Sequence, residues 1–453
     1  MPDFRAECLV LGGGIAGLTA AFSLQEAGIK VQLIDRGPSA GGVIRTMRSP
    51  SGHHLDVGAN SAANHPALLD LIHALGLESK TLTASQHAGV RYIAKAGELH
   101  KVWPSPLFLL TTKLLNLGGK LRLLREPWIR SRAHSQESVQ AFFTRRLGPQ
   151  AYEYLINPVI GGIYAGDPGQ LHMHSVMSRL VEWESSHGSL FQGLRKTAGK
   201  GPKRSILSFE GGMQQLPQTI ADRLGSTGHF GQQITSLQQK GKQWVVHTQE
   251  ESGQEHTFLG DQLIWALPAH QHPLLPDSLA ILSAQLANTP FVSMGMVQLA
   301  FPGAPPASLE RGFGFLVPEQ ESHLLLGAIW NSAVFPQNQP HNQEVWTLFV
   351  GGSRTPFPDQ ATFEAAVPEA VRQFLTYVPF EEAPVYQRSF FWPQAIPQYD
   401  LQQPKRVQAI QQHSPENFHL IGNTLSGVSV GDCIGHAQET VKQLLAVLSP
   451  QMA

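Results

Sequence analysis

The segment CLVLGGGIAGLTAAFSL, residues 8–24, constrains the fold of this chain more than any other stretch. Its apolar beginning predicts a buried strand over residues 6–11, and its end predicts a helix over 18–27. A glycine-rich turn of the form G-x-G-x-x-G lies between them, and a second predicted strand, KVQLID, follows at 30–35. Strand, turn, helix and strand predict a βαβ unit, which is the context in which such a turn binds a dinucleotide.

The glycines of this turn each meet a separate requirement of a dinucleotide site. Gly12 allows the tight turn, Gly14 lets the backbone approach a pyrophosphate, and Gly17 lets the helix pack closely on the strand. Ile15 and Ala16 begin the helix, whose free N–H groups and partial positive charge favour an anion. The alternative, a glycine-rich turn that serves packing only, leaves the complete βαβ pattern unexplained.

An acid closes the second predicted strand. Asp35 lies 23 residues after Gly12, where a carboxylate accepts hydrogen bonds from ribose hydroxyls and disfavours a 2′-phosphate. Asp35 and its neighbour Arg36 are therefore predicted to contact the nucleotide.

The two blocks that follow favour FAD over NAD. RGPSAGGVIRT puts paired glycines and an arginine just beyond the ribose-binding acid, which suits a longer cofactor. HHLDVGANS contains a second glycine turn that could approach a flavin ring. The arginine could also be an ordinary surface residue. The contacts predicted from these blocks are Gly41, Gly42, Arg45, Gly58, Ala59 and Asn60.

Composition limits the remaining classes. A chain of 453 residues suggests two or three domains, and a net charge of −1 with 15% charged residues argues against a nucleic-acid partner. Cys8 and Cys433 are the only cysteines, so no disulfide framework is expected and a reducing compartment is favoured. With no secretory signal pattern and no run of 18 apolar residues, we expect a cytoplasmic protein. The sequence leaves a homodimer open.

Two H-x-H pairs, His172/His174 and His270/His272, are the nearest approach to a metal motif. No cysteine or carboxylate cluster accompanies either pair, so we interpret them as ordinary polar histidines and expect no metal site.

Residues 101–132 combine leucines with seven basic residues and one acid, Glu126. Trp103, Phe108 and Trp128 lie among them. Basic and aromatic residues beside an apolar helix face are typical of a peripheral contact with an anionic membrane. Lys and Arg side chains also cover apolar helix surface in water, so a solvated helical subdomain stays an equal alternative.

Further blocks downstream give the sequence a family resemblance. These are LGPQAYEYLINPVIGGIYAGDP (147–168), SFEGGMQQLP (208–217), GFGFLVPE (312–319), FWPQAIPQYD (391–400) and GNTLSGVSVGDCI (422–434). Together with GGGIAGL they resemble the oxygen-dependent protoporphyrinogen and coproporphyrinogen oxidases, a family of the flavin amine oxidase superfamily. The similarity extends over nearly the whole chain.

The resemblance implies an α/β fold in three parts. A discontinuous, Rossmann-like FAD domain would comprise 1–85, 206–270 and 400–453. A helical, membrane-contacting domain would span 86–205, and a substrate domain built on a mixed sheet would span 271–399.

The resemblance also implies residue roles. The ADP half and pyrophosphate would be held by the glycine-turn residues, Asp35, Gly42 and Arg45, with the adenine near Ile234, Ala266 and Pro268. Val430, Gly431 and Asp432 would approach the ribityl and flavin side, and Asn60 and Gly162 would lie at the flavin as catalytic residues. Arg91 would pair with a substrate propionate while Leu316, Ile329 and Phe349 sandwich the macrocycle.

The reaction implied is the removal of six hydrogens from a porphyrinogen, in three cycles that each reduce O₂ to H₂O₂. Protoporphyrinogen IX and the more carboxylated coproporphyrinogen III both remain open as substrates. Another amine oxidase or desaturase of the superfamily is a second enzyme alternative. A non-enzymatic escort protein on the same fold is a third, although the complete nucleotide block argues against it.

Three details depart from simple patterns. Asp35 stands where the family usually has the longer Glu, and Ile329 stands where leucine is common. GVSVG at 427–431 matches a hydrolase nucleophile elbow, but only 22 residues follow it, too few for the remaining triad members. Cys433 follows Gly-Asp rather than a covalent flavin motif, so we interpret it as a packing residue.

Overall fold

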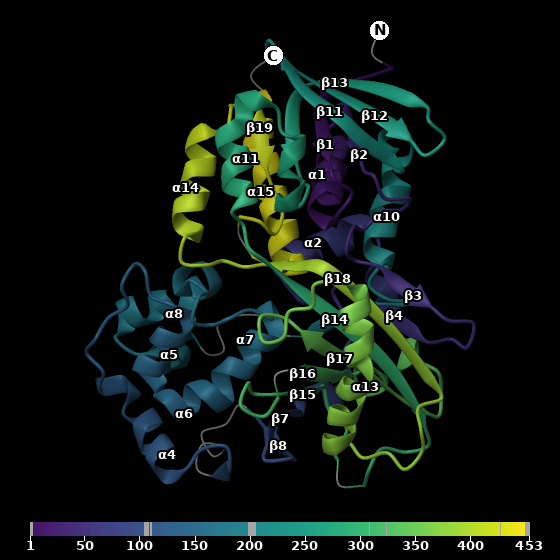
Figure 1. Ribbon diagram of the computed structural model, residues 1–453. Helices are drawn as coiled ribbons and strands as arrows, with labels where there is room; N and C mark the ends of the chain where they lie inside the picture. Colours follow the sequence, from purple (N-terminus) through teal and green to yellow (C-terminus); the bar gives the residue numbers. More distant parts are fainter. Residues whose placement is uncertain are drawn as a thin grey trace.

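The computed structural model describes residues 3–103, 108, 111–197, 205–307, 309–322, 324–425 and 427–448. Two large mixed sheets dominate the structure, one at the top and one at the lower right of Figure 1, and a group of helices lies at the lower left. The α/β class predicted from the sequence is confirmed.

The first sheet has the order β10-β2-β1-β13-β12-β11, with β19 also paired to β13. Strands β10, β2, β1, β13 and β19 run parallel to one another, as the predicted βαβ unit requires. Beside them, β12 pairs antiparallel with both β13 and β11. The strands are β1 (Phe4–Leu11), β2 (Val31–Ile34), β10 (Gly228–His229), β11 (Gln232–Lys240), β12 (Gln243–Glu250), β13 (Glu255–Trp265) and β19 (Phe418–Leu420).

Helices cover both faces of this sheet because its parallel strands are apolar on both sides. Cys8 and Val10 point into the core beneath one group of helices, whereas Leu9 and Leu11 point into the core beneath the other. The first group is α1 (Ile15–Glu26), α2 (Pro66–Leu75), α10 (Gln215–Leu224) and α15 (Val430–Leu448); the second is α11 (Ala280–Ala287) and α14 (Gln403–His413).

The second sheet has the order β18-β14-β17-β16-β15-β7-β8. Its outer face packs on α13 (Gln360–Tyr377) through large buried side chains such as Leu348 and Phe374. The strands are β7 (Arg91–Lys95), β8 (Glu98–Val102), β14 (Phe291–Pro302), β15 (Gly314–Leu316), β16 (Leu325–Trp330), β17 (Gln343–Gly351) and β18 (Tyr386–Pro397).

The β7–β8 hairpin lies within the range 86–205 that the resemblance assigned to helices. Its strands pair through the Ala96-Gly97 turn, whose two residues have positive φ (52° and 79°), as a tight hairpin turn requires. β7 then pairs in parallel with β15, so the hairpin extends the second sheet. Apart from a short 3₁₀ helix at Gln86–Gly89, the described helices of this region begin only after it.

The helical region contains α4 (Leu117–Leu124), α5 (Val139–Leu147), α6 (Pro149–Ala151), a π-helical turn (Tyr152–Ile156), α7 (Asn157–Tyr164), α8 (Met173–His187) and α9 (Leu190–Thr197). Two small sheets complete the structure. In one, β3 (Thr46–Arg48) pairs with β4 (His54–Asp56), and in the other β9 (Ile206–Phe209) lies between β5 (Ala62–Ala63) and β6 (Thr81–Thr83). The short helix α12 (Asn331–Val334) follows β16.

A buried ion pair fixes the helical region internally. Arg146 and Glu126 are both fully buried and paired with each other. Glu126 also accepts hydrogen bonds from the Ser189 hydroxyl (2.5 Å) and the Leu190 N–H (2.8 Å), so it caps the beginning of α9. The single acid of residues 101–132 is thus a structural partner, because only a paired and hydrogen-bonded carboxylate is tolerated in such a core. Within the described residues, no helix combines the length and apolar character needed to cross a bilayer.

Candidate cofactor and substrate site

The glycine turn has the geometry that a dinucleotide cradle needs. Gly12 has φ +110°, and a Cβ there would lie 2.8 Å from the Ala266 carbonyl oxygen. A Cβ at Gly17 would lie 1.9 Å from the Gly12 carbonyl oxygen, so only glycine lets α1 approach β1 this closely. At Gly14, in contrast, a Cβ would meet no atom within 4 Å. Gly14 therefore borders open space at the beginning of α1, where a pyrophosphate fits.

The donors of that cradle are backbone N–H groups. Gly14 caps α1 without a side-chain hydrogen bond, and Leu18 is the residue whose N–H bonds back to the Gly14 oxygen. The N–H groups of Ile15 and Ala16 belong to the first turn, which has no intrahelical acceptors. They are thus placed to meet an anion next to Gly14.

Asp35 lies at the end of β2, beside the turn. One carboxylate oxygen accepts from the Gly13 N–H and the other from the Gly37 N–H, both at 2.6 Å. Each oxygen keeps lone pairs for further donors, so the carboxylate is held in place yet still able to accept from a ribose. Its neighbour Arg36 is exposed.

The Gly41-Gly42 loop folds against the glycine turn. The Gly41 N–H donates to the Gly13 oxygen (2.8 Å), and a Cβ at Gly42 would lie 3.2 Å from the Gly14 Cα. Arg45 is exposed; its Nε donates to the Gly42 oxygen (2.9 Å), and its guanidinium lies 5.7 Å from the centre of the Trp392 ring.

The three residues predicted near the adenine lie in different surroundings. Ala266 follows β13 and its methyl group packs beside Gly17. Pro268 is exposed, two residues further on. Ile234 is buried in the core on the face of the sheet opposite α1.

The beginning of α15 lies next to α1 and carries the C-terminal glycine block. Val430 is buried, and Gly431 packs so closely on His65 that a Cβ would lie 2.4 Å from the histidine Cβ. Asp432 accepts from the Ser429 hydroxyl (2.6 Å) and so contributes to the cap of its own helix. Burial raises the pKa of the Cys433 thiol to about 12, which keeps it protonated and unreactive.

The second glycine turn packs on the segment that follows the Gly41-Gly42 pair. A Cβ at Gly58 would lie 2.0 Å from the Val43 oxygen, and Ala59 packs against the core beneath α1. Asn60 is half-buried; its Nδ2 donates to the Asp56 backbone oxygen (3.0 Å) and its Oδ1 accepts from Asn331 (3.3 Å). Burial raises the pKa of the Asp56 carboxyl to about 6, although its bonds from Thr46 and from a backbone N–H oppose the shift.

The register of the second sheet places the predicted substrate residues on one face. Leu316 pairs with Gly327, which pairs with Phe349, and two positions along the strands Gly314 pairs with Ile329 and with Arg91. Directly opposed residues share a face, and so do residues two apart on one strand. Leu316, Ile329, Phe349 and Arg91 therefore lie on the face opposite α13, which we call the inner face.

α7 packs against this inner face. A Cβ at Gly162 would lie 2.7 Å from Leu316 Cδ2, and Phe349 packs in a small apolar cluster with Ala165. Gly162 itself is exposed, and its neighbour Ile163 is 48% exposed. Gly162 thus lets α7 approach the sheet while one side of the helix stays open.

Arg91 is exposed and its guanidinium lies 5.3 Å from the centre of the Phe313 ring. Ile329 packs beside the same phenylalanine, together with Val334 and Phe335. Arg91 and Ile329 are thus close neighbours, whereas Phe349 lies nearer the β3–β4 hairpin, among Leu55 and Val57.

Sequence reasoning gave no role to three residues that the structure brings to this region. Trp392 is half-buried, donates from Nε1 to the Val57 oxygen and lies beside Arg45. Asn331 and Thr347 form a hydrogen-bonded link to Asn60. The FWPQAIPQYD block contained Trp392, but its place beside Arg45 follows from strand pairing that no local pattern encodes.

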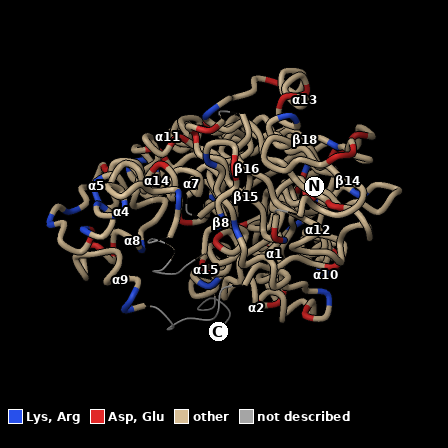
Figure 2. The backbone as a smooth tube through the Cα atoms, turned by 90° about the horizontal axis from the view of Figure 1, so that it is seen from below, with Lys and Arg blue, Asp and Glu red and all other residues tan. Residues whose placement is uncertain are grey.

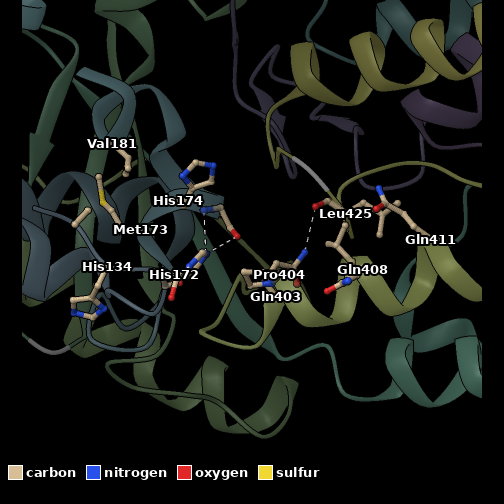
Figure 3. A pocket seen from close by; sticks show the side chains of 14 residues that line it. His134, His172, Met173, His174, Val181, Gln403, Pro404, Gln408, Gln411 and Leu425 are labelled. Carbon is tan, nitrogen blue, oxygen red and sulfur yellow. Dashed lines mark hydrogen bonds between the residues drawn. The ribbon is translucent and has the colours of Figure 1, made fainter. Parts of the chain in front are cut away.

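A cavity of about 600 Å³ lies elsewhere, between the beginning of α8 and α14 (Figure 3). His172 and His174 of the first H-x-H pair line it, with His134, Gln403 and Leu425 among its other walls. Both ring nitrogens of His172 are engaged, by the Ser175 hydroxyl and the Ser135 oxygen at 2.8 Å each. None of the predicted cofactor or substrate residues lines this cavity. Within the described part of the chain, no three His, Cys, Asp or Glu side chains converge as metal ligands.

Comparison with known proteins places this geometry in a family. The model of the protein family described as "Flavin containing amine oxidoreductase" matches residues 15–445 of this chain. The chain belongs to the flavin-containing amine oxidoreductase family. The predicted cofactor, FAD, is thereby confirmed, and the cradle at Gly14 fits its pyrophosphate.

Relatives of this flavoprotein share its full length. It is 30% identical to protoporphyrinogen oxidase from Homo sapiens, with 96% of this chain and 98% of the relative covered, and 30% identical to that from Bos taurus with the same coverage. It is 27% identical to protoporphyrinogen oxidase 2 from Arabidopsis thaliana, with 97% and 94% covered.

Solved structures show the same fold at lower identity. A protein from Exiguobacterium sp. 255-15 with a provisional protoporphyrinogen oxidase name superposes with a TM-score of 0.80 at 22% identity, covering 98% of this chain and 99% of that one. UDP-galactopyranose mutase superposes with a TM-score of 0.76 at 16% identity, covering 98% and 94%. Because an oxidase and a mutase share the fold, the fold alone does not select the reaction.

Proposed function

We propose that this flavoprotein oxidises a porphyrinogen to the corresponding porphyrin with O₂ as electron acceptor. The observation that carries the proposal is the inner face of the second sheet, where Leu316, Ile329 and Phe349 share one surface with Arg91 at the beginning of β7. A flat apolar macrocycle with carboxylates at its rim needs such a surface: apolar walls for the rings and a cation for a propionate. Protoporphyrinogen IX is the substrate we favour, because the full-length relatives carry that name.

FAD, when bound, supplies the hydride acceptor and the route of electrons to O₂. Six hydrogens leave the substrate in three two-electron steps, and three O₂ are reduced to three H₂O₂. The chain itself binds and orients. The turn at Gly14 and the N–H groups of Ile15 and Ala16 hold the pyrophosphate, while Asp35 holds a ribose. Asn60 and Gly162 flank the reacting centre, Asn60 through its carboxamide and Gly162 by leaving room beside Leu316.

The domain division follows from these roles. We propose that 1–85, 206–270 and 400–453 form the cofactor domain and that 271–399 form the substrate domain, apart from α11, which packs on the first sheet. Residues 91–102 add their hairpin to the same sheet, which supports a substrate contact for Arg91.

A peripheral membrane contact is a separate part of the proposal. Leu117, Leu121 and Leu124 of α4 are 73%, 51% and 49% exposed, and Trp128 is 77% exposed. Positions three and four apart share a helix face, so the leucines form one exposed apolar stripe. Figure 2 shows basic positions around α4 and α5 at the outer end of the helical region. Such a surface favours an anionic membrane, and flotation with anionic vesicles tests it against the solvated alternative.

The central test is an aerobic fluorescence assay that offers protoporphyrinogen IX and coproporphyrinogen III to the purified, FAD-loaded protein. We expect porphyrin fluorescence to rise with protoporphyrinogen IX, together with H₂O₂. A faster rise with coproporphyrinogen III would reassign the substrate within the same reaction, and no fluorescence with either would refute the proposal. Protein that stays colourless after reconstitution with FAD would show that no flavin binds, and the proposed oxidation would then have no electron acceptor in the protein.

Arg91 provides the residue-level test. Arg91→Ala should raise KM for the porphyrinogen about tenfold, because a charge-assisted hydrogen bond to a propionate is lost, and should leave kcat nearly unchanged. Arg91→Lys keeps the charge, and its KM should lie between those of the wild type and Arg91→Ala. An unchanged KM in Arg91→Ala would remove this residue from the substrate site.

A further inference from the structure

Three hydrogen bonds connect the second sheet to the turn that holds Asn60. Thr347 Oγ1 donates to Asn331 Oδ1 (2.8 Å), and Asn331 Nδ2 donates to Asn60 Oδ1 (3.3 Å). Asn60 Nδ2 then donates to the Asp56 backbone oxygen (3.0 Å). Every donor points the same way, so the chain of bonds has one direction, from the sheet to the turn.

The Asp56 end of this chain determines the orientation of both amide groups, because a hydroxyl such as that of Thr347 can donate or accept. The Asp56 carbonyl accepts only, so the Asn60 NH₂ group has to face it. The Asn60 oxygen accepts from the Asn331 NH₂ group, and the Asn331 oxygen then accepts from the Thr347 hydroxyl. Reversing either amide would set two acceptors or two donors against each other. The arrangement is shielded from water, because Thr347 is fully buried and Asn331 is 9% exposed.

The chain also joins the two proposed halves of the site. Thr347 pairs directly with Ile329 across β17 and β16, so its side chain starts from the inner face. Asn331 follows Ile329 by two residues at the beginning of α12. Asn60 ends the glycine turn that we propose for the flavin.

We infer that Asn331 and Thr347 are positioning residues that orient the carboxamide of Asn60 toward the bound FAD. With one N–H and one lone pair engaged, Asn60 keeps a second N–H and a second lone pair at its open side for cofactor or substrate. The kinetic consequence of this inference rests on the proposed function; its consequence for bound FAD does not.

The test compares Thr347→Val, which has the shape of threonine without the hydroxyl, with Thr347→Ser, which keeps the hydroxyl. Two readouts are measured on FAD-loaded protein: the visible circular dichroism of the bound flavin, and kcat and KM for protoporphyrinogen IX. We expect Thr347→Val to change the dichroism and to lower kcat about tenfold while KM stays within about twofold, as the loss of one orienting hydrogen bond predicts. Thr347→Ser should restore both values.

A second variant covers the case in which Thr347→Val fails to fold. Asn331→Asp keeps the volume and the acceptor for Thr347 but lacks the N–H that Asn60 accepts. We expect the same change in dichroism and kcat. Wild-type dichroism and kcat in a folded Asn331→Asp or Thr347→Val would overturn the inference, and so would a Thr347→Ser as impaired as Thr347→Val. If the wild type oxidises no porphyrinogen, the proposed function falls, whereas the dichroism comparison still decides the role of the two residues.

Discussion

The glycine turn and the inner face of the second sheet are assembled in different ways. The turn takes its parts from neighbouring positions: Gly12, Gly14 and Gly17 surround the beginning of α1, and Asp35 closes the next strand. The inner face takes Arg91, Leu316, Ile329 and Phe349 from four strands, β7, β15, β16 and β17. Backbone shape defines the first region and strand register defines the second.

This difference determines how each region should respond to substitution. In the turn, the glycines are needed because they lack a side chain. A substitution that adds a Cβ should therefore prevent either folding or cofactor binding. On the sheet, neighbouring residues alternate between the core under α13 and the inner face, so adjacent positions should fail in different ways.

The largest effect is expected at Gly17. Gly17→Val would place a Cβ 1.9 Å from the Gly12 backbone oxygen, which cannot move without displacing β1 from α1. We expect a loss of more than about 4 kcal/mol in the free energy of unfolding, seen as little soluble folded protein. Gly89→Ala, where a Cβ would meet no atom within 4 Å, is the control and should express normally. A stable Gly17→Val would show that α1 and β1 do not need to pack this closely at Gly17.

The next effect separates two adjacent residues of β17. Leu348 is fully buried under α13, and Leu348→Ala should cost about 2–5 kcal/mol of stability in urea unfolding. Phe349 is half-buried on the inner face, and Phe349→Ala should cost less stability but raise KM for the porphyrinogen. An equal KM for the porphyrinogen in Leu348→Ala and Phe349→Ala would contradict a separate role for the inner face.

Gly14→Ala tests whether the glycine turn binds the cofactor without affecting the fold. Because a Cβ at Gly14 meets no protein atom and its φ is an ordinary −72°, the apoprotein should keep its stability within about 0.5 kcal/mol. The methyl group would stand where the pyrophosphate approaches, so FAD affinity should fall about 100-fold, or about 2.7 kcal/mol. Fluorescence titration of the apoprotein with FAD measures this. Unchanged affinity would place the pyrophosphate elsewhere.

The smallest effect concerns Asp56, at the boundary between the two regions. Burial raises its pKa to about 6 in the folded protein, against about 3.8 when exposed, so the folded state binds the proton more tightly. Stability therefore falls as pH rises from about 4 to about 6 and is level above that range. Asp56→Asn keeps an oxygen for the bonds from Thr46 and the Met213 N–H, and should remove this fall.

At pH 7 we expect Asp56→Asn to be more stable than the wild type by about 1–2 kcal/mol, with no difference near pH 3.5. Urea unfolding at several pH values measures the difference between the two proteins. A constant difference across the whole range would assign the gain to something other than this carboxyl.

Some features of this protein were readable from its sequence because their cause is local. The glycine spacing, the apolar runs and Asp35 lie within one βαβ unit, and backbone sterics alone demand that pattern. The family resemblance implied a substrate domain built on a mixed sheet and named Leu316, Ile329 and Phe349, without giving them a common surface.

Only the tertiary structure decided which residues meet. The β7–β8 hairpin joins the second sheet by pairing with a strand more than 200 residues away, which brings Arg91 beside Ile329. Glu126 is a buried cap rather than a surface charge because Arg146 folds against it. The link from Thr347 through Asn331 to Asn60 has no sequence signature, because hydrogen bonds between distant segments depend on packing and register that short-range patterns do not encode.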